Sequence, residues 1–345
     1  MAIIDQVIQD RYAAYNADTM EVLPTLADDS IDFTVFSPPF PETFAYSNDP
    51  RDLANCATYE EGLRHYGFIV DELHRLTKPG RLVAVHCMDL KKGTWFQRDF
   101  PGDIVRTHVA AGFNFFCRVT IWKDPWVIAR RTRMRSLMHK TIVSDSSLSR
   151  VAGPDYVLVF RKSGENAVKI QHPHGLKTYA GSTPVPGELL EKYLRFKGDQ
   201  RKNLLSHWIW RQYASPVWMD IRGGKIMPFI EAKGSDEESH ICPLQQDIIE
   251  RCLTLWSNPD DVVLTPFMGV GSEVAGAVLL GRKGVGTELK PTYFRQAVKN
   301  IEAAMKSHAD KNKTLFDDVP SSEEELGTED YSDSMDFIDL QESDV

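Results

Sequence analysis

The amino-acid sequence predicts an α/β fold with a doubly wound, mainly parallel sheet and an inserted recognition region. Three observations predict it. Residues 31–86 read as a buried strand, an amphipathic helix and a second strand. Residues 244–305 repeat this alternation, which is typical of a parallel sheet with helices on both faces. Between these halves, residues 163–239 show no clean period and are rich in Gly, Pro, Trp, Lys and Arg.

The first half begins with an apolar, β-branched and aromatic run at 31–36, which we expect to be a strand. It ends at Ser37-Pro38-Pro39, because a double proline cannot continue a sheet ladder. Apolar residues at helical spacing predict a helix over 59–78, which Pro79-Gly80 closes. Further elements are expected as a strand at 81–86, a helix at 103–111 and strands at 113–122 and 155–160.

The last third repeats the same order of elements. We expect a helix at 244–256, a strand at 262–264, a glycine turn, a helix at 273–280, a strand at 284–287 and a helix at 293–305. No internal repeat is present. We therefore expect residues 1–162 and 240–312 to be two halves of one catalytic domain, with 163–239 as the target-recognition region.

Composition favours an intracellular, cytoplasmic protein. The chain has 345 residues, 42% of them hydrophobic, which suffices for one large domain with a smaller insertion. It has no run of 18 apolar residues and no signal peptide, so we expect no membrane partner. Its five cysteines are odd in number and form no CxxC pair, which argues against a disulfide framework and a zinc site. His86, Cys87 and Cys117 are expected to be buried strand residues, and no metal is predicted.

The net charge of −9 is unevenly distributed. Residues 317–345 contain twelve Asp or Glu and no Lys or Arg, so without them the formal charge becomes +3. We expect residues 313–345 to be an acidic, disordered tail, with a docking segment for a partner as the alternative, since apolar side chains interrupt the acids. The remaining body is mildly basic, which is compatible with a nucleic-acid partner.

The turn from Phe267 to Ser272, Phe-Met-Gly-Val-Gly-Ser, follows a strand and precedes a helix. Glycines there allow positive φ and close approach of a ligand to the helix N-terminus. Glu288 lies just past the next strand, where a carboxylate can accept hydrogen bonds from two ribose hydroxyls. The turn lacks the third glycine or the lysine of a pyrophosphate-binding loop, so a nucleoside without phosphates fits better.

Ser37-Pro38-Pro39-Phe40 has the parts that methylation of a base amine needs. The lone pair of such an amine is delocalised into the ring. Two acceptors, the Ser37 hydroxyl and the Pro38 carbonyl, would favour a tetrahedral nitrogen aimed at a methyl donor, while Phe40 stacks on an extruded base. The alternative is a proline-rich strand exit with an ordinary serine.

These two motifs resemble those of the DNA amino-methyltransferases, in the permuted arrangement called the β group. There, [DNS]PP[FYW] precedes the recognition region and FxGxG comes last, as in residues 12–305 here. The resemblance implies a Rossmann-like methyltransferase fold, S-adenosyl-L-methionine as methyl donor, double-stranded DNA as substrate, base flipping and a place in restriction-modification.

The resemblance also implies roles for single residues. Asp18 would contact the donor's adenine and Glu288 its ribose, with His240 and Pro243 around the methionine part. The remaining donor contacts would come from Thr265, Phe267, Gly269, Gly271 and Ser272. Two positions depart from the family pattern: Thr265 stands where an acid is usual, and the spacing from His240 to Pro243 is short.

Ser37 favours cytosine-N4 over adenine-N6 methylation, because serine is commoner at this position in the cytosine-N4 enzymes. A hydroxyl can accept a hydrogen bond from either amine, so adenine-N6 stays open. A catalytically silent DNA-binding or decoy protein is an alternative of another class. The sequence indicates neither the target site, nor a restriction partner, nor the oligomeric state.

Residues 123–150 carry seven Lys or Arg against two Asp, as expected of a phosphate-binding surface. The insert adds further basic residues, which can read guanine edges. We expect Trp208 and Trp210 to be core residues, although an aromatic could fill the gap left by a flipped base. The expected DNA contacts are Arg130, Arg131, Arg133, Arg135, Lys140, Arg201, Lys202 and Arg211.

Overall fold

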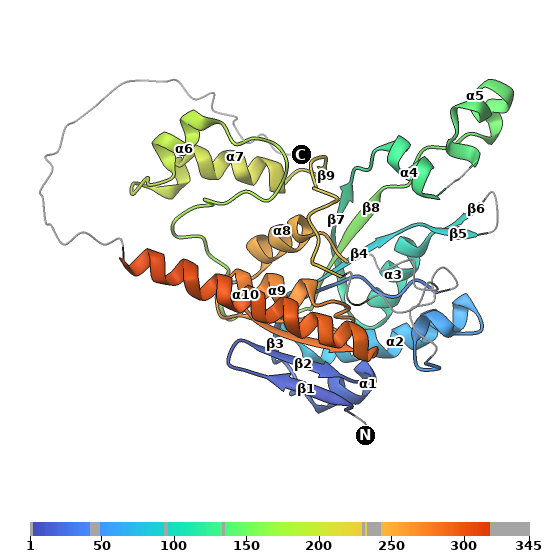
Figure 1. Ribbon diagram of the computed structural model, residues 1–345, viewed down its shortest axis with the longest axis horizontal. Coiled ribbons are helices and arrows are strands. Elements are labelled where there is room, and N and C mark those ends of the chain that lie inside the picture. Colours follow the sequence, from blue (N-terminus) through green and yellow to red (C-terminus); the bar gives the residue numbers. More distant parts are fainter. Residues whose placement is uncertain are drawn as a thin grey trace, which may run out of the picture.

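The structure is a computed structural model and describes residues 3–41, 49–92, 96–132, 135–229, 232 and 243–317. In this part of the chain, nine strands form one sheet in the order β1-β2-β11-β10-β3-β4-β8-β7-β9 (Figure 1). Two short strands, β5 (Leu90–Lys92) and β6 (Phe96–Arg98), pair separately. The strands of the large sheet are β1 (Asp5–Ile8), β2 (Tyr12–Asn16), β3 (Ile31–Phe36), β4 (Thr77–Met88), β7 (Asn114–Ile121), β8 (Asp155–Arg161), β9 (Val217–Trp218), β10 (Val262–Thr265) and β11 (Lys283–Glu288).

The centre of the sheet is parallel, as the sequence predicts. Strands β2, β11, β10, β3 and β4 run in one direction. Strand β8 is antiparallel to both β4 and β7, and β1 is antiparallel to β2. The predicted doubly wound α/β fold is therefore confirmed, with antiparallel pairings toward both edges.

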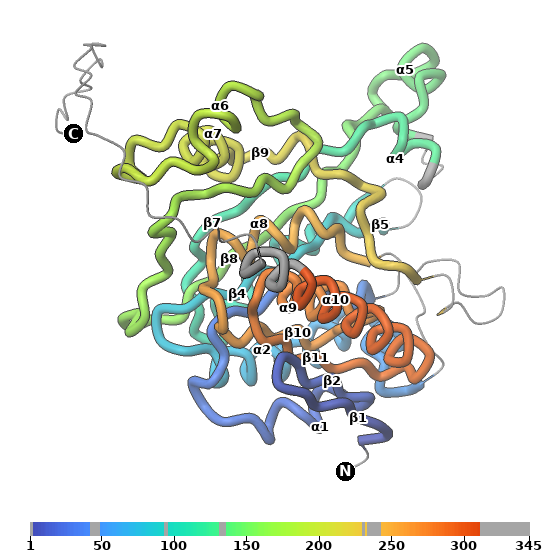
Figure 2. The backbone as a smooth tube through the Cα atoms, turned by 60° about the vertical axis from the view of Figure 1, so that its left-hand side comes forward, coloured from blue at the N-terminus to red at the C-terminus, as the bar shows by residue number. Residues whose placement is uncertain are grey.

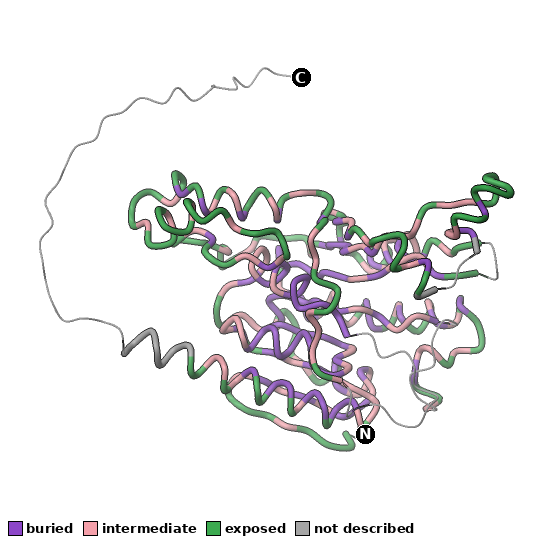
Figure 3. The backbone as a smooth tube through the Cα atoms, turned by 45° about the horizontal axis from the view of Figure 1, so that its top comes forward, coloured by how far each residue is buried: buried purple, intermediate pink, exposed green. Residues whose placement is uncertain are grey.

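Helices cover both faces of the sheet (Figures 1 and 3). On one face, α2 and α3 pack on Phe36, Val83 and Val85. On the other face, α8 and α9 pack on Phe33 and Val35, so neighbouring residues of β3 point to opposite sides, as strand geometry requires. Helix α10 packs outside α9. The helices are α1 (Thr19–Val22), α2 (Tyr59–Leu76), α3 (Phe100–Ala110), α4 (Pro125–Thr132), α5 (His139–Asp145), α6 (Gly187–Tyr193), α7 (Leu204–Tyr213), α8 (Gln246–Trp256), α9 (Ser272–Leu279) and α10 (Pro291–Asp317).

Helix α2 shows how local sequence fixes the helix ends. Thr58 is the N-cap and accepts a hydrogen bond from the Glu61 N–H, and the Glu61 carboxylate accepts one from the N–H of Ala57, the residue before the cap. The prediction of a helix to residue 78 was wrong at its end, because α2 stops at Leu76 and β4 begins at Thr77. Thr77 already pairs with Ile31 of β3, so sheet pairing overrides the helical pattern there.

The parallel strands bring four loops to one edge of the sheet. The carboxyl ends of parallel strands share an edge, and ligands of open α/β sheets bind there. Asp18 follows β2, Ser37 follows β3, Phe267 follows β10 and Glu288 ends β11. Strand β7 runs in the same direction as β4, because both are antiparallel to β8. Residues 122–154, which follow β7, therefore leave the sheet at this edge as well.

Two peripheral parts stand out from the sheet. Residues 122–132 and 135–154, with α4 and α5, form an arm, which we call the β7–β8 arm (Figures 1 and 2). Helices α6 and α7 share a small core of their own and lie away from α5 in both views. Within the described residues, no helix is both long enough and apolar enough to cross a membrane.

Two expectations about these outer parts need correction. Trp210 is 55% exposed, so the prediction that it is a core residue was wrong, whereas Trp208 packs edge-on against Tyr179 at 4.9 Å. Both tryptophans lie on α7, but only the face with Leu205 and Ile209 is covered. Helix α10 reaches Asp317, so residues 313–317 of the expected disordered tail are helical. The rest of that tail lies outside the described residues.

Candidate active site

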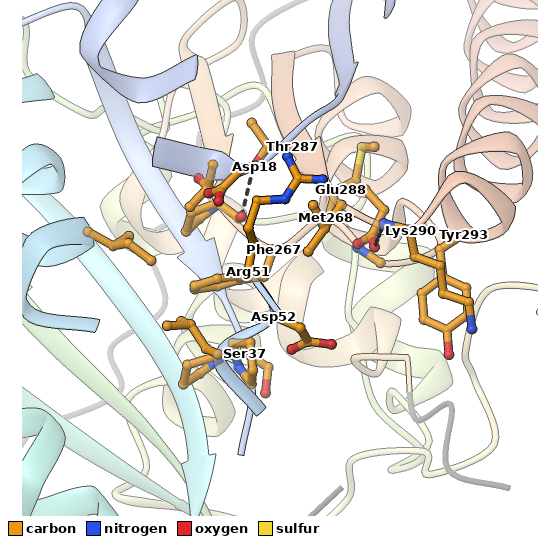
Figure 4. A pocket seen from close by; sticks show the side chains of 18 of the residues that line it. Asp18, Ser37, Arg51, Asp52, Phe267, Met268, Thr287, Glu288, Lys290 and Tyr293 are labelled. Carbon is orange, nitrogen blue, oxygen red and sulfur yellow. Dashed lines mark hydrogen bonds between the residues drawn. The ribbon is translucent and has the colours of Figure 1, made fainter. Parts of the chain in front are cut away.

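A cavity of about 410 Å³ opens where the carboxyl ends of β2, β3, β10 and β11 meet. Its walls contain all four residues of the Ser-Pro-Pro-Phe motif and most of the glycine loop. In the close view, Phe267 lies between Ser37 on one side and Asp18 with Glu288 on the other (Figure 4). The predicted residues in its lining are Asp18, Ser37, Pro38, Pro39, Phe40, Pro243, Phe267, Gly269, Ser272 and Glu288.

The loop after β3 is held by the buried strand that precedes it. Pro38 is buried and Ser37 is partly exposed to the cavity. The Phe40 ring meets Phe100 of α3 edge-on at 5.9 Å, which fixes its plane. Phe36, the last residue of β3, contacts Phe267 of the glycine loop at 5.8 Å between ring centroids. The strand that leads into the Ser-Pro-Pro-Phe motif is therefore in direct contact with the glycine loop, although the two are far apart in sequence.

The glycine loop is tied to the end of β11. Gly269 has φ 54° and donates its N–H to Glu288 Oε2 at 2.8 Å, and the Lys290 N–H donates to Glu288 Oε1 at 2.8 Å. The Met268 N–H donates to the Thr287 carbonyl at 2.8 Å. Gly271 has φ 85° and serves as the N-cap of α9. These contacts hold the Glu288 carboxyl at the cavity wall, where a ribose is expected.

Two carboxyl groups of this wall have raised pKa values. Burial raises the pKa of Glu288 to about 7, although hydrogen bonds from the backbone of Lys290 and Gly269 oppose the rise. Burial also raises the pKa of Glu273 to about 8, and the negative charge of Glu288 adds to the rise. Glu273 is only 4% exposed, lies in the first turn of α9 and lines the cavity. Sequence reasoning missed Glu273, because nothing in its immediate pattern distinguishes it from an ordinary helix-start acid.

Asp18 lies on the far side of the cavity from Ser37. Its carboxylate accepts a hydrogen bond from the Met20 N–H at 2.9 Å and so caps α1. The Ala17 N–H donates to the Glu288 carbonyl at 3.1 Å, which joins the ends of β2 and β11. Asp18 and Glu288 therefore share one end of the cavity, as adenine and ribose contacts of one adenosine must.

Two predicted donor contacts, among the residues that the structure describes, do not line this cavity. Thr265 is buried at the end of β10, and Gly271 faces Ala297 of α10, so neither lines the cavity. His240 lies outside the described residues. Pro243, whose assignment rested on the same short spacing, does line the cavity. Among the described residues, no three His, Cys, Asp or Glu side chains gather as a metal site requires.

A second group that sequence reasoning missed stands behind Ser37. Ser37 Oγ lies 3.4 Å from His86 Nδ1, and His86 Nε2 lies 3.0 Å from Asp155 Oδ2. Lys123 forms an ion pair with the same Asp155 oxygen. The histidine was expected to be a buried strand residue, and no local pattern connects it with an acid 69 positions away. The antiparallel pairing of β4 with β8 creates the contact.

The expected DNA contacts fall into two separate groups. Arg130 and Lys140 are exposed on the β7–β8 arm, while the side chains of Arg131, Arg133 and Arg135 lie outside the described part. Arg201, Lys202 and Arg211 are exposed near α7. The arm and α7 lie apart in the views of Figures 1 and 2, so the structure does not gather these residues into one basic patch.

The sequence matches a known family over most of its length. The family model described as DNA methylase (N6_N4_Mtase) matches residues 31–299. The chain is 27% identical over 285 residues to the Type II methyltransferase M.BglII of Bacillus subtilis, covering 81% of this chain and 66% of that protein. It is 25% identical over 280 residues to the Type II methyltransferase M.MthZI of Methanothermobacter thermautotrophicus, covering 76% and 69%. The chain thus spans about two thirds of the length of these relatives.

Solved structures share the fold. The PvuII DNA methyltransferase (cytosine-N4-specific) superposes with a TM-score of 0.56 at 15% identity, covering 87% of this chain and 92% of that one. A DNA modification methylase of Thermus thermophilus gives a TM-score of 0.54 at 21% identity, covering 86% and 95%. At such identities the likeness concerns the fold alone, and it agrees with the Rossmann-like sheet described above.

Proposed function

The chain belongs to the family of S-adenosylmethionine-dependent DNA methyltransferases that act on base amines, and from this premise we propose that it methylates the N4 amine of a cytosine flipped out of double-stranded DNA. One observation carries the proposal: the Ser-Pro-Pro-Phe loop and the glycine loop line the same cavity, and Phe36, which ends the strand before the first loop, contacts Phe267 of the second. A donor bound at one end can therefore face a base amine at the other.

The donor lies, in this proposal, along the wall from Asp18 to Ser272. Asp18 contacts the adenine, Glu288 the ribose, and Pro243 with the start of α9 the methionine part. Gly269 provides the close approach, since a Cβ built there meets no atom within 4 Å. Thr265 and Gly271 do not line the cavity, so in this proposal neither contacts the donor. The donor is a cation at its sulfur and its amine, so nearby carboxylates favour it.

Donor binding is expected to strengthen as the pH rises from 6 to 9. Over this range the carboxyls of Glu288 and Glu273, with pKa values of about 7 and about 8, lose their protons and attract the cationic donor. A tightening of roughly tenfold, about 1.4 kcal/mol, is expected in the Kd from titration calorimetry. The Glu273→Gln variant is expected to lose the part of this change above pH 7.

S-adenosylhomocysteine is the matched control ligand, because it lacks the sulfonium charge, and its Kd is expected to vary less with pH.

The stability of the donor-free protein is expected to change with pH in the opposite direction to donor affinity. The raised pKa values mean that the folded donor-free protein binds more protons than the unfolded chain, so its stability falls as the pH rises through 4.5 toward 8. The donor should therefore raise the Tm more at pH 8.5 than at pH 6. An equal rise at both would contradict the assignment.

The β7–β8 arm is proposed to hold the duplex. It leaves the sheet at the edge where the cavity opens, and Arg130 and Lys140 expose charge suited to phosphates. Trp126 on this arm is 64% exposed, which suits an aromatic that contacts DNA after a base has been flipped. Residues 163–239 remain the proposed target-recognition region, with Arg201, Lys202 and Arg211 as exposed candidates. Their separation from the arm suits contacts at two places along one duplex.

The choice of cytosine rather than adenine as the target base rests on Ser37 alone. Transfer of labelled methyl groups to plasmid DNA, followed by nucleoside analysis, is expected to give N4-methylcytosine. Appearance of N6-methyladenine instead would move the assignment to adenine at the same site. No incorporation by a protein that binds the donor would support the catalytically silent alternative. Digestion of the modified DNA with restriction enzymes would then show whether modification is confined to one sequence.

A further inference from the structure

The hydrogen-bonded chain behind Ser37 is built by the sheet itself. Phe36 pairs with Val85 across β3 and β4, so the next residues, Ser37 and His86, lie side by side at the carboxyl edge. Asp155 opens β8, opposite Met88, and so reaches the other side of the imidazole. Ser37 lines the cavity, whereas His86 and Asp155, 11% and 6% exposed in their side chains, stand behind it.

Asp155 is held as a carboxylate. Burial alone would raise its pKa, but the hydrogen bond from His86 and the hydrogen bond and charge of Lys123 oppose burial and hold the pKa below its usual value. A carboxylate is only an acceptor, so the proton of neutral His86 sits on Nε2 and points at Asp155. Nδ1 is then an acceptor, and it faces the Ser37 hydroxyl at 3.4 Å. This distance is long, and catalytic hydrogen bonds commonly tighten in the substrate complex.

We propose that His86 and Asp155 form a relay behind Ser37, which holds the hydroxyl as an acceptor for the target amine and takes up the proton that this amine releases. A hydroxyl has one proton and two lone pairs. When its proton is directed to His86, both lone pairs are left for the cavity side. A serine hydroxyl can otherwise donate its proton to the lone pair of the amine and so block the attack. The relay prevents this, because it keeps the hydroxyl proton on the side of His86.

The proton balance of the reaction gives the relay its second role. The amine nitrogen attacks the donor methyl, the C–N bond forms, and the C–S bond breaks with its electron pair going to sulfur. The methylated nitrogen then carries one proton too many. That proton passes to Ser37 Oγ as the serine's own proton moves to His86 Nδ1, and Asp155 balances the imidazolium charge until solvent removes the proton. His86 acts through Ser37 and is therefore a positioning residue.

This inference rests on the proposed amine methylation, and the test separates the two. Single-turnover methyl transfer to DNA is measured from pH 5.5 to 9 with the full-length protein. The wild-type rate is expected to fall toward acid pH, because the relay must be free to take up the proton that the amine releases. The His86→Gln variant is expected to lose this fall and to be about 100-fold slower at pH 8, with an unchanged donor Kd. In Asp155→Asn the fall is expected to be displaced along the pH axis, because the carboxylate that faces His86 Nε2 has been removed.

His74→Gln is the matched control, since His74 lies in the last turn of α2 against Phe113, at the opposite edge of the sheet. It should keep both the rate and the pH profile. A wild-type profile in His86→Gln would overturn the relay while leaving the methyltransferase proposal intact. No transfer by the wild type at any pH would overturn both. If His86→Gln does not fold, the shift expected of Asp155→Asn decides, and its absence counts against the relay.

Discussion

Replacing Gly269 with aspartate is expected to abolish donor binding. The Gly269 φ of 54° lies in the left-handed region that Asp and Asn tolerate better than other side chains, so the loop itself should survive. A Cβ at this position meets no atom within 4 Å, and the residue lines the cavity. The new side chain would therefore fill space that the donor needs, beside the Glu288 carboxyl. Calorimetry should show a Kd raised by at least about 100-fold, or about 2.7 kcal/mol.

Gly269→Asn tests whether bulk or charge causes the loss, and the bulk argument predicts a similar loss. Gly271→Ala is the structural control. Its Cβ would approach Ala297 Cα of α10 to 3.0 Å at a φ of 85°, so it should cost about 1–3 kcal/mol of stability. Because Gly271 does not line the cavity, the molecules that remain folded should keep their donor affinity. Weakened binding in Gly271→Ala with an unchanged Tm would refute this division.

The sequence predicted the central sheet because its signals are local. The runs that became β3 and β10 are short, mainly apolar and bounded by turn residues, and the helices beside them carry a clear period. The run that became β11 has few apolar residues, and its position between two predicted helices indicated a strand. Strand β2 was not predicted: Tyr-Ala-Ala-Tyr-Asn has weak strand propensity, and its pairing with β11 involves residues more than 270 positions away. Sheet pairing over such distances leaves no mark in a single window of sequence.

The residues of the candidate site also fall into those that a local motif predicts and those that it does not. Ser37 and Gly269 stand in compact motifs, and the structure places both in one cavity. His86, Asp155 and Glu273 carry no motif, and their surroundings arise only when distant strands pair or when burial removes water. The prediction that Trp210 is a core residue failed for a related reason. Two closely spaced tryptophans on one helix need not face the same side, and the sequence alone does not show which side is buried. Residues whose chemistry is set by partners far along the chain are those that sequence reasoning misses.

Truncating Phe40 to alanine is expected to lower turnover while leaving donor affinity nearly unchanged. Phe40 lies on the acceptor side of the cavity, where Phe100 holds its ring edge-on at 5.9 Å. Stacking of a base on an aromatic ring contributes about 1–3 kcal/mol, so loss of the ring should slow single-turnover methyl transfer by roughly 5- to 150-fold. Pro38→Ala should also slow transfer, because the rigid kink that aims the Pro38 carbonyl is lost.

Phe96→Ala is the matched control for Phe40→Ala, since Phe96 is an exposed phenylalanine of β6 outside the cavity lining. It should change neither transfer nor donor binding. The decisive comparison sets the Phe40 and Pro38 variants against Gly269→Asp, with transfer and donor Kd measured on the same preparations. If all three lose donor affinity equally, the cavity cannot be divided into a base end and a donor end. If the Phe40 and Pro38 variants lose only the transfer step, the two loops bind different molecules and the methyl group crosses between them.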